Sequence, residues 1–146
     1  MLSYETSTVA RAGGDTAWAV WTDVKGWNRY DHIEDARIDG AFQAGAVITS
    51  KAKGFPRSTL TVTRVEQPTL WVDESRSPGM RMTFDHVLEP GQGGTRLTER
   101  VRISGPLGRL LGPLMRRKLE ALFATSVAAV ASQAETADAG PQAHAP

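Results

Sequence analysis

His86 and Glu99 are the two side chains of this sequence that could exchange a proton with each other. Side chains of an extended strand point alternately to its two faces. Within residues 80–89, His86 therefore shares a face with four apolar residues: Met80, Met82, Phe84 and Leu88. Within residues 95–104, Glu99 shares a face with Thr95, Leu97, Val101 and Ile103. Both faces are expected to look into the core, so an imidazole and a carboxyl would be buried among hydrophobic neighbours.

The glycine-rich segment between these two strands predicts a β-hairpin, and its turn decides how the pair is aligned. A loop over residues 91–94 pairs position 90 with position 95 and puts His86 directly opposite Glu99; a loop longer by two residues makes them diagonal neighbours. In either register the pair could act as an acid/base dyad, anchor the polar end of a ligand, or form an ion pair that only shapes the core. Glu99 could also bond the loop before the last helix.

The remaining chain predicts an α+β architecture that positions this pair. Strand-forming segments cover residues 3–10, 35–40, 46–53, 59–66, 70–75, 80–89 and 95–104. A tryptophan-rich helix capped by Asp15 follows the first strand, Gly26 ends it, and residues 27–31 make a second short turn of helix. The expected fold is a seven-stranded antiparallel curved sheet with two short helices after the first strand.

A long amphipathic helix is predicted to close the chain and to fill the concave side of the sheet. Its leucine-rich stripe extends from Leu107 to Val130, and Gly112-Pro113 is expected to break or kink it near its start. Residues 137–146 are rich in Ala, Pro and Gly and are expected to be a disordered tail, which leaves one domain over residues 1–136.

Composition excludes several classes of function. The 146 residues carry a net charge of +1 with mixed signs, which does not favour a nucleic-acid partner. There is no cysteine, and the three histidines lack the spacing of metal ligands. No glycine-rich phosphate loop is present, so no cofactor and no metal are expected. Neither a signal peptide nor a stretch for stable membrane insertion is recognisable, which predicts a cytoplasmic protein.

The order of these elements resembles the START-like superfamily, in its bacterial polyketide cyclase/dehydrase and lipid-transport (SRPBCC) branch. The resemblance covers residues 3–135 and rests on Thr22-Asp23-Val24, Trp27, Gly94-Thr95-Arg96-Leu97-Thr98 and the long last helix. It implies a helix-grip fold with an apolar pocket. Members bind lipids, sterols, polyketides or hormones, and some cyclise or dehydrate polyketides with a pocket cluster of Tyr, Arg, Asn and Trp. That cluster has no residue-by-residue match here; Trp27 fits the aromatic residue that the family has after its first helix, and Tyr30 does not match a functional tyrosine of the family.

We therefore predict a hydrophobic small molecule, lipid-like or polyketide-like, between the sheet and the last helix. The alternatives are a cofactor-free cyclase or dehydratase in which His86 and Glu99 are catalytic, and a partner-binding module without a ligand. Whether the protein is an enzyme, and whether it is a homodimer, stays open. The residues expected to bind the ligand are Trp27, Tyr30, Met80, Met82, Phe84, His86, Leu97, Glu99, Leu111, Leu114, Met115 and Leu122.

Overall fold

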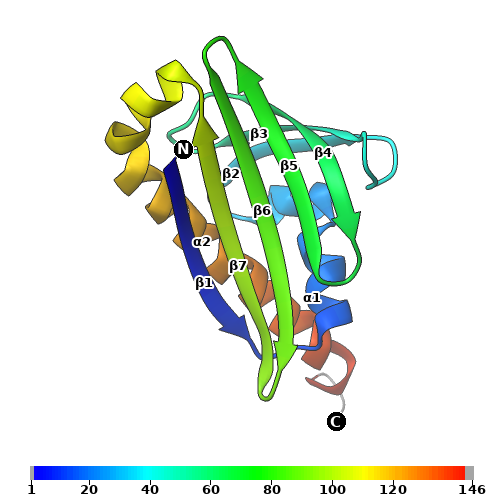
Figure 1. Cartoon of the computed structure of the whole chain (residues 1–146). Helices are drawn as coiled ribbons and strands as arrows, with labels where there is room; N and C mark the ends of the chain where they lie inside the picture. Colours follow the sequence, from blue (N-terminus) through cyan, green and yellow to red (C-terminus); the bar gives the residue numbers. More distant parts are fainter. Residues whose placement is uncertain (1, 144–146) are drawn as a thin grey trace.

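The computed structural model describes residues 2–143, and its seven strands form one sheet that curves around the last helix (Figure 1). The elements in chain order are β1 (Leu2–Ala10), α1 (Gly14–Trp21), the 3₁₀ helix η1 (Val24–Arg29), β2 (Ile33–Asp39), β3 (Val47–Ala52), β4 (Ser58–Glu66), β5 (Leu70–Ser77), β6 (Met80–Gly91), β7 (Gly94–Ser104) and α2 (Pro106–Ala143). This arrangement confirms the predicted α+β helix-grip fold.

The sheet order explains how the chain encloses a space. The strands lie in the order β1-β7-β6-β5-β4-β3-β2, and all neighbours are antiparallel. The first strand therefore pairs with the last, while β2 lies at the opposite edge. Helix α2 packs along β1 and β7, and the short helices α1 and η1 lie near one end of the concave side (Figure 1). The space between α2 and strands β3 to β6 is bounded on several sides.

The β6–β7 hairpin has the register that places His86 directly opposite Glu99. Pro90 pairs with Thr95, and Gly91 pairs with Gly94 beyond it, so the turn is tighter than a loop over residues 91–94. Gly94 has φ of +140°, and any side chain there would collide with the backbone of Ala10 on β1. A glycine is required because the hairpin and the end of β1 approach each other this closely.

Both ends of the first helix differ from the sequence-based expectation: α1 ends at Trp21, and Gly26, which was expected to end it, lies within η1. Helix α1 begins at Gly14 after Gly13 as N-cap, and no side chain caps it; Asp15 lies within the first turn. A carboxylate there still favours the helix electrostatically. Of the break or kink expected at Gly112-Pro113, α2 has the kink: the helix continues through these residues, and Figure 1 shows its first turns, in yellow, at an angle to the orange remainder. Pro113 lacks an amide hydrogen, which accounts for a bend without a break.

The domain boundary expected at residue 136 falls inside a helix. Helix α2 extends to Ala143, and residues 144–146 of the expected tail lie outside the described residues. Two contacts join this part of α2 to the start of the chain. Glu135 accepts a hydrogen bond of 2.7 Å from the backbone of Arg11, and Asp138 accepts one of 2.9 Å from the Thr16 hydroxyl. Both contacts tie the end of α2 to the region around α1.

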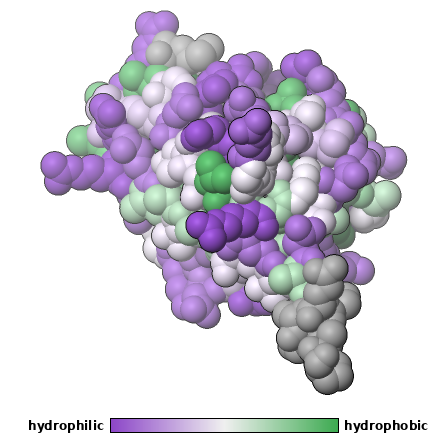
Figure 2. Space-filling view, turned by 90° about the horizontal axis from the view of Figure 1, so that it is seen from below, coloured by the Kyte–Doolittle hydropathy of each residue, from purple (hydrophilic) through white to green (hydrophobic). Residues whose placement is uncertain are grey.

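The core is densest where α1 and α2 meet the sheet. Trp71 of β5 is fully buried there, together with Trp21, Leu88 and Leu97. A second apolar group, around Val101 and Phe123, packs the middle of α2 against β6 and β7. At the end of the molecule viewed in Figure 2, hydrophilic residues cover most of the surface and hydrophobic atoms gather in a small central group.

Candidate functional site

A cavity of about 530 Å³ lies between the concave face of the sheet and helix α2. Its volume is within the range of small-molecule sites in proteins, about 300–1,000 Å³. The sheet contributes inward-facing residues of β3 to β7, and α2 contributes Met115, Leu119, Leu122, Phe123, Ser126 and Val130. Most of the lining surface is apolar, and polar side chains from several strands and from α2 interrupt it, which suits a hydrophobic molecule held in a fixed orientation.

Nine of the twelve residues predicted for ligand binding surround this cavity. They are Trp27, Tyr30, Met80, Met82, Phe84, His86, Glu99, Met115 and Leu122. The sheet members among them come from alternate positions of β6 and from β7, as strand alternation requires. Whether they contact a ligand stays a prediction, but their common location is a property of the fold.

The other three predicted residues, Leu97, Leu111 and Leu114, do not line the cavity. Leu97 faces inward and is fully buried, but it belongs to the core beneath α1, where helices fill the space. Leu114 is 79% exposed, because the face of α2 that packs on the sheet passes through Gly108, Gly112, Leu119 and Phe123, and Leu114 lies on the other side of the helix. Leu111 is half-buried in the first turns of α2.

His86 is held as a neutral imidazole between two tryptophans. Its ring stacks on Trp71, with centroids 3.5 Å apart and planes 1° from parallel, and Trp21 meets it edge-on at 5.2 Å. Nδ1 lies 3.2 Å from the Trp71 carbonyl oxygen, so this nitrogen carries the proton and donates, while Nε2 keeps its lone pair. Burial lowers the pKa of His86 to about 3, against hydrogen bonds to the backbone of Trp71 and Phe84 that raise it.

Glu99 faces His86 across the hairpin, but the two do not form an ion pair at neutral pH. Glu99 Oε2 is 3.7 Å from His86 Nε2, which is longer than a hydrogen bond. Burial raises the pKa of Glu99 to about 7, and the Ser126 hydroxyl of α2 partly opposes this. At neutral pH the pair is thus an uncharged imidazole beside a carboxyl that is partly protonated. A satisfied ion pair, one of the roles left open by the sequence, does not describe this arrangement.

Asp73 is a polar residue of the cavity that the sequence analysis missed. It lies on β5 opposite Phe84, is only 2% exposed and lines the cavity. Burial first, and then the nearby charge of Glu99, raise the pKa of Asp73 well above its ordinary range. Strand alternation in the sequence could have indicated it. Every second residue of β5 points to the same face, so Asp73 shares a face with the buried Trp71.

Half-buried aromatic residues line another part of the cavity. Trp27 donates its indole hydrogen to the Trp21 carbonyl oxygen at 3.0 Å and stacks against Trp71 with centroids 6.0 Å apart. Tyr30 stacks on His32, with centroids 5.8 Å apart and planes 9° from parallel. These contacts fix the rings of η1 and of the segment after it, so this part of the lining is preformed.

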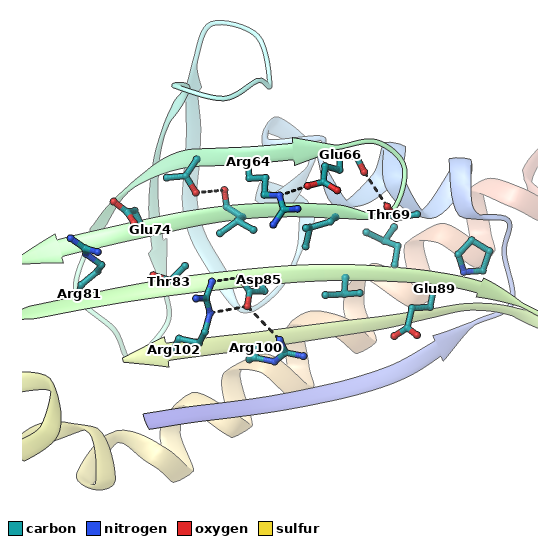
Figure 3. Close-up of a pocket in the computed structure, with 16 residues that line it drawn as sticks. Arg64, Glu66, Thr69, Glu74, Arg81, Thr83, Asp85, Glu89, Arg100 and Arg102 are labelled. Carbon is teal, nitrogen blue, oxygen red and sulfur yellow. Dashed lines mark hydrogen bonds and ion pairs between the residues drawn. The ribbon is translucent and has the colours of Figure 1, made fainter. Parts of the chain in front are cut away.

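A larger hollow of about 980 Å³ lies on the opposite, convex face of the sheet and has a different character (Figure 3). Charged side chains line it, and they pair with one another. Arg102 holds Asp85 through two hydrogen bonds of 3.0 and 2.8 Å, and Arg100 lies 3.6 Å from the same carboxylate. Because the hollow is the more open of the two and most of its charged residues already have a partner, the cavity on the concave side is the candidate site.

Metal sites and membrane-spanning helices are the two other features to consider within residues 2–143. No group of three or more His, Asp or Glu side chains has the arrangement of a metal site in this part of the chain. Likewise, neither helix among these residues offers a long enough apolar stretch to cross a bilayer.

Comparison with known families decides which family the chain belongs to. The family model described as polyketide cyclase/dehydrase and lipid transport matches residues 1–135. The chain belongs to this polyketide cyclase/dehydrase and lipid transport family. The match confirms the resemblance inferred from the order of the sequence elements. A comparison with curated protein sequences finds no match.

Solved structures with the same fold include proteins of several kinds. The di-domain aromatase/cyclase StfQ from the steffimycin biosynthetic pathway aligns with a TM-score of 0.68 at 13% identity, over 98% of this chain and 52% of that one, so this chain spans about half of StfQ. Norcoclaurine synthase from Thalictrum flavum aligns with a TM-score of 0.71 at 14% identity, over 90% and 85% of the chains. Protein NE0264 from Nitrosomonas europaea aligns with a TM-score of 0.67 at 16% identity, over 90% and 95%. At these identities the likeness concerns the fold.

Membership of the polyketide cyclase/dehydrase and lipid transport family is consistent with hydrophobic ligand binding and with cyclase-type chemistry. The cavity has features suited to either role. Its apolar walls suit a hydrophobic molecule, and its buried acid groups suit the polar end of that molecule or a proton transfer.

Proposed function

We propose that this protein binds a hydrophobic small molecule, lipid-like or polyketide-like, in the cavity between the sheet and α2. The observation that carries the proposal is the cavity itself: about 530 Å³ of space with mainly apolar walls in a chain whose core is otherwise packed. Leaving such a space empty forgoes packing contacts, so a bound apolar molecule stabilises the folded protein. The family assignment supports the same role.

Filling the cavity is expected to block binding. Leu122→Trp places a larger ring on the α2 side of the cavity, and we expect its affinity for the apolar dye ANS to fall about tenfold or more below that of the unchanged protein, because the dye and the ring need the same space. A fluorescence titration measures this affinity, and native mass spectrometry of the purified protein shows whether a cellular ligand is retained.

Leu114→Trp is the matched control for this variant. It introduces the same ring on the same helix at a position that is 79% exposed and away from the cavity, so dye binding should be unchanged. Thermal unfolding checks that both variants are folded. If the unchanged protein binds no apolar probe, the proposed binding function is refuted.

A second candidate function, acid–base catalysis on the bound molecule, is favoured by Glu99. Its carboxyl has a pKa of about 7, which suits a group that must both take up and release a proton near neutral pH. Cyclisation and dehydration both need such proton transfers.

A general test reaction can detect this base without knowledge of the natural substrate. In the ring opening of a nitrobenzisoxazole, a base removes the carbon-bound proton while the N–O bond breaks to give a phenolate. We expect the protein to accelerate this reaction. The rate should rise with pH and level off above about 7, because Glu99 accepts the proton only in its ionised form. Glu99→Gln should reduce the rate about 100-fold.

The exposed Glu120 of α2 provides the control for that test. Glu120→Gln removes a carboxylate that pairs with Arg116 on the surface, and the rate should not change. Equal rates for the Glu99 and Glu120 variants would refute catalysis by Glu99.

A further inference from the structure

Asp73 and Glu99 are two buried carboxyls that each have an oxygen atom without a hydrogen-bond partner. Among the described residues, Asp73 Oδ1 and Glu99 Oε1 are shielded from solvent and receive no hydrogen bond. The two residues are 2% and 8% exposed, and both line the cavity. Burying a polar atom without a partner is costly, so native proteins rarely keep such atoms unless something else satisfies them. Here the atoms border a space that a ligand can enter.

The two carboxyls flank the middle of β6. Asp73 pairs with Phe84 from the β5 side, and Glu99 pairs with His86 from the β7 side. Each residue lies in the concave face next to the same two positions of β6. Burial raises the pKa of Asp73, and the negative charge of Glu99 raises it further.

None of the basic side chains that line the cavity neutralises this pair. The imidazole of His86 is uncharged, since burial lowers its pKa to about 3, and burial also lowers the pKa of His32, whose ring stacks on Tyr30. Arg57 is engaged by Asp35 at 2.8 Å, and Arg76 by Glu74 at 2.8 Å, and both guanidinium groups are mostly exposed. On the convex face of the sheet, Arg100 and Arg102 form ion pairs with Asp85. The acid groups in the cavity therefore lack a counter-charge among the described residues.

We propose that the polar end of the ligand is a protonated amine held between Asp73 and Glu99, with its apolar part against the Phe84 and Phe123 side of the cavity. This inference rests on the proposed binding function. An ammonium group has three N–H donors and no acceptor. The cavity offers three acceptors: Asp73 Oδ1, Glu99 Oε1 and the Nε2 lone pair of His86. A bound cation also relieves the repulsion between the two carboxyls, because it attracts both.

Ligands that differ only in their polar end test this proposal. Isothermal titration calorimetry with decylamine, decanol and decanoic acid at pH 7.5 compares an ammonium, a hydroxyl and a carboxylate on the same chain. We expect decylamine to bind about tenfold or more tightly than decanol, and decanoic acid to bind most weakly. At pH 6, decylamine binding should also release protons, seen as a dependence of the enthalpy on the buffer, because the cation favours the ionised carboxyls.

A pair of double variants separates site binding from general attraction to negative charge. Asp73→Asn with Glu99→Gln should lose the preference for decylamine and keep decanol binding. Glu66→Gln with Glu120→Gln removes the same number of carboxyl groups, but from the surface, and should keep the preference. If decanol or decanoic acid binds the unchanged protein as well as decylamine does, the amine proposal is overturned while the binding function stands. If none of the three binds, the binding function itself fails.

Discussion

Replacing Trp71 with alanine is expected to lower the free energy of unfolding by about 3–5 kcal/mol, the usual cost of removing a buried tryptophan side chain. Trp71 is fully buried at the centre of an aromatic group. It stacks on His86 and Trp27, and it meets Trp21 and Phe42 edge-on with centroids 6.2 and 5.1 Å apart. Its removal leaves a large void that these rings cannot close. Urea denaturation followed by circular dichroism measures the loss.

Val9→Ala and Trp71→Phe are the comparisons for this experiment. Val9 is 46% exposed on β1, so its truncation should cost less than about 1 kcal/mol. Trp71→Phe keeps a stacking ring and removes an indole N–H that is buried without a partner, so it should cost clearly less than alanine. Similar losses for Trp71→Ala and Val9→Ala would contradict the central position of this ring.

Replacing Glu99 with glutamine is expected to change the pH dependence of stability. The pKa of Glu99 is about 7 in the folded protein and near 4.5 in the unfolded chain. Its contribution is therefore complete below pH 4.5 and is lost as the pH rises through 7, because the folded state must then bury a charge. Relative to the unchanged protein, Glu99→Gln should gain about 3 kcal/mol between pH 4.5 and pH 8. Urea denaturation of both proteins across this range measures the difference.

The titration of His86 changes the stability with pH in the opposite direction to that of Glu99. The experiment therefore compares the Glu99→Gln variant with the unchanged protein, since both contain His86. Burial lowers the pKa of His86 from 6.5 to about 3, so its contribution is complete above pH 6.5 and is lost as the pH falls toward 3. This effect is present in both proteins and cancels in the comparison. Glu120→Gln, at an exposed ion pair, should give a difference that does not vary with pH. A flat difference for Glu99→Gln as well would mean that this carboxyl is not buried in the folded protein.

The pairing of His86 with Glu99 could be predicted from sequence because local rules determine it. Strand alternation fixes the face of each side chain, and the glycine-rich turn restricts the register to two choices. The same alternation places Asp73 on the face of Trp71, and applying it to β5 as well would have identified the second carboxyl. The protonation states of His86, Glu99 and Asp73 were not predictable, because they depend on burial and on the distance between strands that are not neighbours in sequence.

The positions of Leu97 and Leu114 show what alternation and helical periodicity leave undetermined. Both residues fit an apolar face, yet Leu97 lies under the helices and Leu114 faces solvent at 79% exposure. Periodicity tells which face of an element is apolar, but in the first turns of α2 the small residues Gly108 and Gly112 face the sheet, and which face does so depends on how the whole helix crosses it. The bend near Pro113 and the close approach of Gly112 to Leu2 set that crossing, and both are tertiary properties.

The pairing of β1 with β7 determines when during synthesis the cavity can exist. Leu2 pairs with Ile103, so the sheet closes only after about a hundred residues have been made, and α2 follows later still. Contacts between such distant parts of a chain form slowly. A nascent chain that has left the ribosome as far as Ser104 has the strands but not the helix that closes the cavity. The cavity therefore forms only after α2 has been made, and a message truncated before α2 yields a chain with an exposed apolar sheet, which is prone to aggregate.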